Sequence, residues 1–343
     1  MAYDNHEVSV EQEIGTVIVS RPHLVILGAG ASLATCPMGD AYGRPLPLMS
    51  TLVAELGLKD LLPQRWRDNT EDFEQLYDAL TDAGEQDVCR QLQQRVCEQF
   101  EKLELPPQPT IYDHLVLSLR GTDVIASFNW DPLLLQAHCR NRSHAMSVPK
   151  LAFLHGNVSM AYCPDDKIIS VPGTVCRVCG KVMTPSPLLF PVRHKDYASD
   201  AAIADQWKLF SAALKNAFML TIFGYRGPRT DAEALKRMRS AWGRPNTRAY
   251  EQTAFITRPG ATSNDLSTHW GAFVFSHHHE RCDDFYMSWI AKHPRRTGEA
   301  WWNQYFEAKF IRDNPIPRGL AFSELWKWYG QFSAAEEKHA AEG

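Results

Sequence analysis

The chain has 343 residues, of which 44% are hydrophobic, and its formal net charge at pH 7 is −4. This length is sufficient for one large domain or two ordinary ones. A charge so close to neutral gives no electrostatic basis for binding nucleic acid or an anionic bilayer, so we expect no direct nucleic-acid binding. The composition favours small-molecule chemistry.

The first residues contain neither a basic n-region nor an apolar h-region, and no stretch approaches the roughly 20 apolar residues that span a membrane. We therefore expect a cytoplasmic protein with no membrane association. The eight cysteines are too sparse for a disulfide scaffold, which favours a reducing compartment.

Strand and helix patterns alternate along the chain, which is typical of an α/β domain with a parallel sheet. The last predicted strand is 253–257, and we interpret the histidine-rich and acidic segment 277–284 as a solvated helix start. In chain order, the other predicted elements are an edge strand at 15–20, a strand at 24–27, helical segments within 50–119, a strand at 124–128, a helix near 132–139, a strand at 151–154, a helix at 201–216, a strand at 218–223 and a helix near 231–241.

A glycine-rich turn, Gly28-Ala29-Gly30-Ala31-Ser32, follows the strand at 24–27. Glycine allows the backbone to approach a phosphate closely, and a helix that begins at or soon after Ser32 would point its free N–H groups at a diphosphate. Such a turn is also found in many α/β proteins that bind nothing there.

Two later strands also end in polar residues. Asn129 and Asp131 follow the strand at 124–128, and His155 follows the strand at 151–154. Ligands of parallel sheets bind at the carboxyl ends of strands, so these residues are candidates for a site. Alternatively, Asn129 and Asp131 cap the helix that begins near Pro132, and His155 is structural.

Five motifs occur in an order that resembles the sirtuin-like NAD-consuming proteins, over about residues 24–285. The motifs are GAGAS at 28–32, SFNWD at 127–131, LHG at 154–156, CRVCGK at 176–181 and FGYRGPRTD at 223–231. The resemblance implies a Rossmann-like parallel sheet of the sirtuin type. It divides the chain into a catalytic domain at 1–285, with a helical insertion at 50–119 and a zinc-ribbon-like module at 158–190, and a helical tail at 286–343.

The resemblance implies that NAD is the substrate and that its nicotinamide–ribose bond is cleaved. Asn129 matches the asparagine that positions water and ribose hydroxyls, and His155 matches the general base. Asp131 matches the acid that helps to hold nicotinamide. The other cofactor-binding candidates are Gly28, Ala29, Gly30, Ser32, Arg44, Gly224, Tyr225 and Arg226. Alternatively, Arg44 is a solvated loop residue, and residues 224–226 form a plain connection in which Thr230 or Asp231 caps the next helix.

The loop at 36–47 departs from the sirtuin pattern, because the Gly-Ile-Pro-Asp-Phe-Arg sequence is absent. Deacylases of the family are expected to shield the reactive intermediate from water with that phenylalanine, so its absence favours hydrolysis. Trp130 replaces a smaller aliphatic residue and adds bulk beside the expected nicotinamide pocket. We therefore expect an NAD glycohydrolase that releases nicotinamide and ADP-ribose. The alternatives are an NAD-dependent protein deacylase and a subunit that binds NAD or ADP-ribose without turnover.

Divergent relatives of this kind imply a bacterial anti-phage abortive-infection effector. Such an enzyme would be held inactive by assembly or by a partner, for example an ATPase or a nucleic-acid sensor. The aromatic density of the tail implies burial against the domain or against another subunit, and we expect a homo-oligomer.

The module at 158–190 contains a CxxC pair, Cys176 and Cys179, and a third cysteine, Cys163. Asp166 lies where a second cysteine of the first arm would stand, and a carboxylate is a known zinc ligand. A closed set of this kind predicts structural zinc. The alternatives are a histidine ligand from elsewhere and a module without metal.

Overall fold

A six-stranded parallel sheet forms the centre of the molecule, with strand order β10-β9-β8-β2-β3-β4. The strands are β2 (His23–Leu27), β3 (Val124–Ser127), β4 (Lys150–Phe153), β8 (Met219–Phe223), β9 (Gln252–Ile256) and β10 (His279–Cys282). The computed structural model describes residues 6–68, 70–145, 147–192, 197–198, 200–243, 252–258, 270–273 and 279–342. The predicted α/β fold with a parallel sheet is confirmed.

The first strand of this sheet in chain order, β2, lies at its centre, between β8 and β3. The chain runs from β2 outward through β3 to β4, returns to β8 on the other side of β2, and runs outward again through β9 to β10. This is the doubly wound order, in which ligands bind at the carboxyl ends of the two central strands. The turns after β2 and β8 therefore flank the expected binding crevice.

Alternate residues of each strand enter two separate cores. Val25 and Leu27 of β2 pack on one face, and Leu24 and Ile26 pack on the other. The second face is covered by α8 (Ala201–Asn216) and α9 (Ala232–Trp242). The first face is covered by α6 (Ile111–Leu117) and α7 (Leu133–Asn141), together with the insertion helices α3 (Leu52–Glu55), α4 (Phe73–Asp82) and α5 (Gln86–Phe100).

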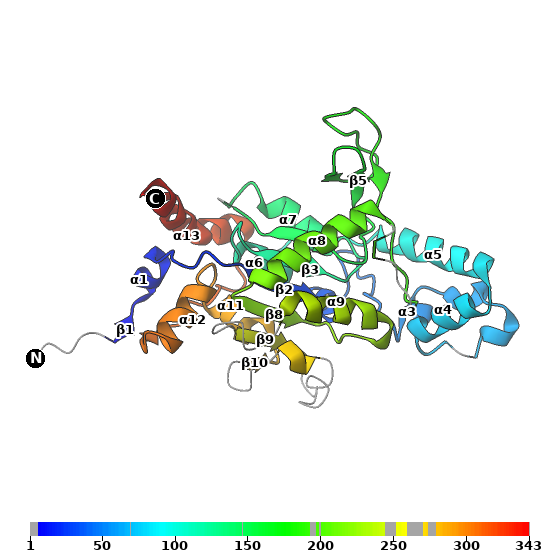
Figure 1. Ribbon diagram of the computed structural model, residues 1–343, viewed down its shortest axis with the longest axis horizontal. Coiled ribbons are helices and arrows are strands. Elements are labelled where there is room, and N and C mark those ends of the chain that lie inside the picture. The colour runs from blue at the N-terminus through cyan, green and yellow to red at the C-terminus, as the bar shows by residue number, and fades with distance from the viewer. Residues whose placement is uncertain are drawn as a thin grey trace, which may run out of the picture.

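Two insertions extend from this body. The helical insertion lies at one end of the molecule, and the module that contains β5 projects away from the sheet (Figure 1). The module is a three-stranded antiparallel sheet of order β6-β5-β7, with β5 (Ala161–Cys163), β6 (Ile168–Ser170) and β7 (Thr184–Pro185).

The tail packs at the end of the molecule opposite the helical insertion (Figure 1). Its elements are α11 (Trp289–Lys292), α12 (Thr297–Tyr305), β11 (Phe310–Ile311) and α13 (Phe322–Glu342), and β11 pairs with β1 (Glu7–Val8), which precedes α1 (Val10–Gly15). Trp301, Tyr329 and Phe332 are at most 2% exposed within the chain. These three rings are buried within their own chain, so they give no evidence for an interface between subunits. Homo-oligomerisation stays a prediction.

One predicted strand is absent, and one predicted helix start is wrong. Residues 16–20 form no strand, because the backbone N–H groups of Ile18 and Val19 donate to the Glu299 carboxylate and not to a neighbouring strand. The helix after β2, α2 (Ala29–Thr35), begins before Ser32, with Gly28 as its extended N-cap.

One strand of the sheet was not predicted. Residues 279–282 pair with β9 as an edge strand, where the sequence was interpreted as a helix start. The polar composition of this segment suits an edge strand with one exposed face. Its partner, β9, lies next to it only in the folded chain, so the sequence pattern does not reveal the pairing. The preceding residues 277–278 lie outside the described residues.

Candidate functional site

The turns after β2 and β8 approach so closely that only glycine fits. A Cβ atom on Gly28 would lie 2.6 Å from Tyr225 Cα, and one on Gly30 would lie 2.9 Å from Gly224 Cα. Gly224 itself has φ +64°, a conformation that side chains disfavour. The N–H groups of Gly28 and Gly30 donate to the carbonyls of Phe223 and Gly224, at 3.0 and 3.1 Å. These two amides are therefore used within the protein, and phosphate binding by this turn stays a prediction.

Asn129 is the centre of a buried hydrogen-bond network that we call the asparagine cluster, formed by Asn129, Ser32, Tyr112 and Asp131. Its amide nitrogen lies 2.9 Å from Gly28 O, 2.9 Å from Ser32 Oγ and 3.3 Å from the Tyr112 hydroxyl. Ser32 donates to Asp131 Oδ2 at 2.7 Å. Among the described residues, Asn129 Oδ1 has no hydrogen-bond partner, so it is the atom that the cluster leaves for a ligand.

Asp131 has the capping role that the sequence left open and also belongs to the asparagine cluster. Its Oδ1 accepts a hydrogen bond from the Leu133 N–H at 3.1 Å, which caps the start of α7, while Oδ2 accepts from Ser32. Burial raises the pKa of this carboxyl, and the hydrogen bonds from Ser32 and Leu133 oppose the rise. A direct contact with nicotinamide stays a prediction.

His155 belongs to a second network, the histidine cluster, formed by His155, Tyr197, Tyr225 and Asp231. The His155 Nε2 atom lies 3.3 Å from the Tyr197 hydroxyl and 3.4 Å from Asp231 Oδ1. Tyr225 donates to Asp231 Oδ2 at 2.7 Å. A carboxylate beside an imidazole orients the ring and stabilises the positive charge that the ring gains when it accepts a proton, and both effects suit a general base.

Phe128 joins the two clusters. Its ring stacks on Tyr225 with centroids 4.1 Å apart and meets His155 edge to face at 4.8 Å, while the next residue is Asn129. The strand ends therefore bring the predicted residues Asn129, Asp131 and His155 to one edge of the sheet. Tyr225 also lies at this edge, and its side chain is buried in the second core.

Three residues of the clusters were not predicted as site residues. Asp231 was interpreted only as a possible helix cap, although it ends the FGYRGPRTD motif. Tyr112 and Tyr197 belong to no motif, and no sequence signal identifies them. Their place follows from the packing of α6 and of the segment before α8.

The two predicted arginines lie differently. The Arg44 guanidinium pairs with Asp40 at 2.7 Å, and Asp40 also accepts from the backbone N–H groups of Tyr42 and Glu104. Arg44 thus stabilises the loop at 36–47 through its ion pair with Asp40. The Arg226 side chain is exposed beside Tyr225. Contact of either arginine with a phosphate stays a prediction.

The site is covered by the helical insertion. Asn129 is 8% exposed and His155 is 6% exposed. The Trp130 ring packs on Phe190 with centroids 4.7 Å apart, and Phe190 stacks on Tyr77 of α4 at 5.1 Å. On the other side, Thr230 donates to Glu74 of α4 at 2.7 Å. Helix α4 therefore contacts both the ring pair that adjoins Asn129 in the chain and the turn that precedes Asp231.

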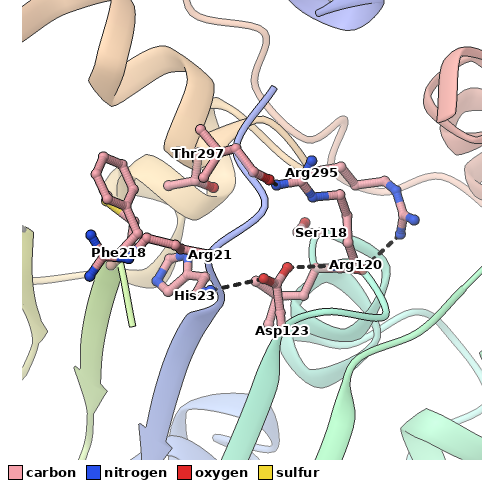
Figure 2. Close-up of a pocket in the computed structure, with 12 residues that line it drawn as sticks. Arg21, His23, Ser118, Arg120, Asp123, Phe218, Arg295 and Thr297 are labelled. Carbon is pink, nitrogen blue, oxygen red and sulfur yellow. Dashed lines mark hydrogen bonds between the residues drawn. The ribbon is translucent and has the colours of Figure 1, made fainter. Parts of the chain in front are cut away.

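A small pocket of about 10 Å³, room for about one water molecule, lies at the opposite, amino edge of the sheet (Figure 2). It is lined by Arg21, His23 and Arg120, among others, and the backbone N–H groups of His23 and Arg120 donate to Asp123 at 2.9 and 2.7 Å. Its arginines are paired within the protein: Arg120 with Glu299 at 3.1 Å, for example. This cavity contains none of the motif residues, and we assign the candidate site to the carboxyl edge.

The predicted metal ligands come together in the projecting module. The donor atoms of Cys163, Asp166, Cys176 and Cys179 all lie within 4.8 Å of one another. Asp166 Oδ2 is 3.1 Å from Cys176 Sγ and 3.4 Å from Cys163 Sγ. Three thiolates and one carboxylate are a tetrahedral donor set that suits zinc. No histidine from elsewhere joins this set among the described residues.

No family model matches the chain, and no curated protein matches its sequence. Solved Sir2 structures are similar in fold. A Sir2 homologue in complex with NAD is 13% identical over 85% of this chain and 94% of that chain, with a TM-score of 0.37. Sir2 bound to an acetylated peptide is 11% identical over 84% and 93%, with a TM-score of 0.38. The similarity is one of fold, so the function is argued below from the side chains of this chain.

Proposed function

We propose that the protein binds NAD at the carboxyl edge of the sheet and hydrolyses it to nicotinamide and ADP-ribose. The observation that carries the proposal is the asparagine cluster. Three contacts hold the nitrogen side of the Asn129 amide and leave Oδ1 for a ligand, and the preceding residue, Phe128, packs against His155. A catalytic group that is held in one orientation before the ligand arrives loses little freedom in the reaction.

In the proposed reaction the nicotinamide ring carries positive charge before the bond breaks, and it leaves with the bonding electron pair as a neutral molecule. The ribose then carries an oxocarbenium-like charge that a water molecule must reach. Asn129 Oδ1 accepts a hydrogen bond from that water or from a ribose hydroxyl and so positions it. His155 takes up the proton, and Asp231 at 3.4 Å stabilises the resulting imidazolium.

The covering of the site supports hydrolysis over transfer to a protein lysine. Trp130, Phe190 and Tyr77 pack together over the strand ends, in addition to the missing phenylalanine of the loop at 36–47. A peptide would have to displace these rings, whereas water needs no groove. The deacylase and the binding subunit without turnover remain as outcomes of the test below.

We further propose that zinc bound by Cys163, Asp166, Cys176 and Cys179 is structural. Four protein ligands close a tetrahedral site and leave no open position for a substrate. The cellular role in anti-phage defence and a regulatory partner are proposals that rest on the family resemblance alone, and the homo-oligomer is a proposal that rests on the aromatic composition of the tail.

The deciding experiment incubates the purified protein with NAD, with and without an acetylated peptide, and separates the products by chromatography. Nicotinamide and ADP-ribose in equal amounts, independent of peptide, support hydrolysis. Acetyl-ADP-ribose that forms only with peptide would identify a deacylase. Binding of NAD by calorimetry without nicotinamide release would identify a subunit without turnover.

A further inference from the structure

Tyr112 is the residue through which α6 reaches the asparagine cluster. Its side chain is fully buried, and its hydroxyl lies 2.8 Å from Ser32 Oγ. Burial raises the pKa of the phenol well above its usual value, so it keeps its proton. Because Ser32 gives its own proton to Asp131, its lone pairs are available to the tyrosine. The phenol thereby orients the serine hydroxyl that holds Asn129.

The other end of α6 is held by α13. The hydroxyl groups of Ser118, directly after α6, and of Tyr329 on α13 lie 2.7 Å apart. Tyr329 also lies 3.4 Å from the carbonyl of His114 in the last turn of α6. Tyr329 is 2% exposed, so this contact is sealed from water.

Arg295 ties the same helix end to α13 by charge. Its guanidinium donates to the carbonyls of Leu117 and Leu119 at 3.2 and 2.7 Å, and it pairs with Glu336 of α13 at 2.6 Å. A cation at this position complements the negative end of the helix dipole.

A second route runs through α7. The Trp326 indole of α13 donates to Asn141 Oδ1 at 2.8 Å, and Asn141 donates to Asp113 Oδ1 at 2.7 Å. Asp113 is next to Tyr112 in α6 and also pairs with Arg140. Helix α13 therefore contacts the carboxyl end of α6 directly and reaches its amino end through Asn141 of α7.

We propose that Tyr112 is a positioning residue for Asn129 and that α13 sets its position by holding α6. The proposal rests on the function proposed above. Helix α6 has seven residues, a length of about 10 Å, so a shift at its carboxyl end is transmitted along the helix to Tyr112. Release of α13 by a partner would then weaken catalysis without any contact with substrate.

The test compares Tyr112→Phe and Tyr329→Phe, each of which removes one hydroxyl, with Tyr305→Phe as the matched control. Tyr305 is 51% exposed and lies on α12, away from α6. The readouts are kcat and KM for NAD, and hydrogen–deuterium exchange of residues 111–117. Exchange reports on the hold of α13 on α6 even where no turnover is measured.

We expect Tyr112→Phe to lower kcat about 10-fold with KM within about twofold, the effect of one lost hydrogen bond to a positioned group. Tyr329→Phe should lower kcat about threefold and raise exchange at 111–117. The double variant should be no slower than Tyr112→Phe alone, because both changes act through one group.

Three results would overturn the proposal: kcat of Tyr112→Phe equal to that of Tyr305→Phe, independent losses in the double variant, or unchanged exchange in Tyr329→Phe. A wild-type protein that releases no nicotinamide would overturn the proposed function instead. In that case the exchange measurement still decides whether α13 holds α6.

Discussion

The two edges of the same sheet are built from different kinds of polar group. At the carboxyl edge, hydroxyls, an amide and single carboxylates hold one another through hydrogen bonds, and Asn129 Oδ1 is left over. At the amino edge and the adjoining tail, arginines and carboxylates neutralise each other, as Arg120 does with Glu299 and Arg295 with Glu336. Directional neutral groups suit the recognition of a ligand, whereas mutually satisfied charges fix one packing arrangement.

Loss of a carboxyl-edge residue should have the largest effect, and it should be on turnover. We expect His155→Ala and Asn129→Ala each to lower nicotinamide release by about 100-fold to 10,000-fold, because each removes a group that acts directly on the reacting atoms. Both residues lie after their strands, so the sheet should still fold. The measurement is the rate of nicotinamide release, with circular dichroism for folding. Either residue leaves the catalytic set if its variant keeps most of the turnover.

Loss of a buried charge in the tail that adjoins the amino edge should instead lower the free energy of unfolding. Glu336 pairs with Arg295 at 2.6 Å and with Arg296 at 2.8 Å, and all three side chains are at most 7% exposed. Burial opposes ionisation of Glu336, but the two arginines outweigh it and lower its pKa. Burial lowers the pKa of Arg296 below its usual value, and the guanidinium is charged because Glu336 bonds it directly.

Glu336→Gln leaves two buried cations with one neutral partner, so we expect the free energy of unfolding to fall by about 3–5 kcal/mol. Urea unfolding at pH 7 measures the change, with Glu337→Gln on the same helix as the control. An effect as small as that of the control would mean that the charge network does not hold the tail.

The metal-binding module at 158–190 lies apart from both edges of the sheet, so its loss should affect mainly the module itself. Cys176→Ser should reduce the zinc content from about one ion per chain to almost none and lower the stability of the module, because structural zinc contributes folding free energy directly. Elemental analysis and thermal melting measure both effects, with Cys139→Ser as the control. A metal-free wild-type protein with the same melting as the variant would contradict the zinc proposal.

The smallest effect should be a pH dependence of stability from the amino edge. Burial, and then the charge of Arg120, lower the pKa of His23 to about 3. The unfolded histidine, with a pKa near 6.5, takes up a proton well above that value, so stability is present above pH 6.5 and is lost as the pH falls toward 3. His114, whose pKa burial lowers to about 4, acts in the same direction.

Each such histidine should reduce the free energy of unfolding by about 1.4 kcal/mol per pH unit in that window. Urea unfolding at pH 7, 6 and 5 measures the slope, and His23→Gln should remove one of the two contributions. An unchanged slope in this variant would show that His23 takes up its proton in the folded state as readily as in the unfolded state.

The sequence predicted the elements that depend on local patterns. The apolar runs of the strands, the helix at 201–216 and the ends of the strands before Asn129 and His155 can be read from periodicity, because the pattern within one element decides them. The segments at 15–20 and 279–282 were misread, since their partners lie far away in the chain. Glu299 takes the N–H groups of the first, and β9 pairs with the second.

For the site, the sequence alone determined the residue types that chemistry needs and their place at strand ends: Asn129, Asp131 and His155, and the cysteines of the metal module. Only the tertiary structure decided what holds them. Tyr112 and Asp231 reach the clusters because α6 and the turn after β8 pack there, and Gly28 is required because a second backbone lies 2.6 Å from its missing Cβ. These contacts join residues between 76 and 197 positions apart in the chain, and no pattern within a single element encodes them.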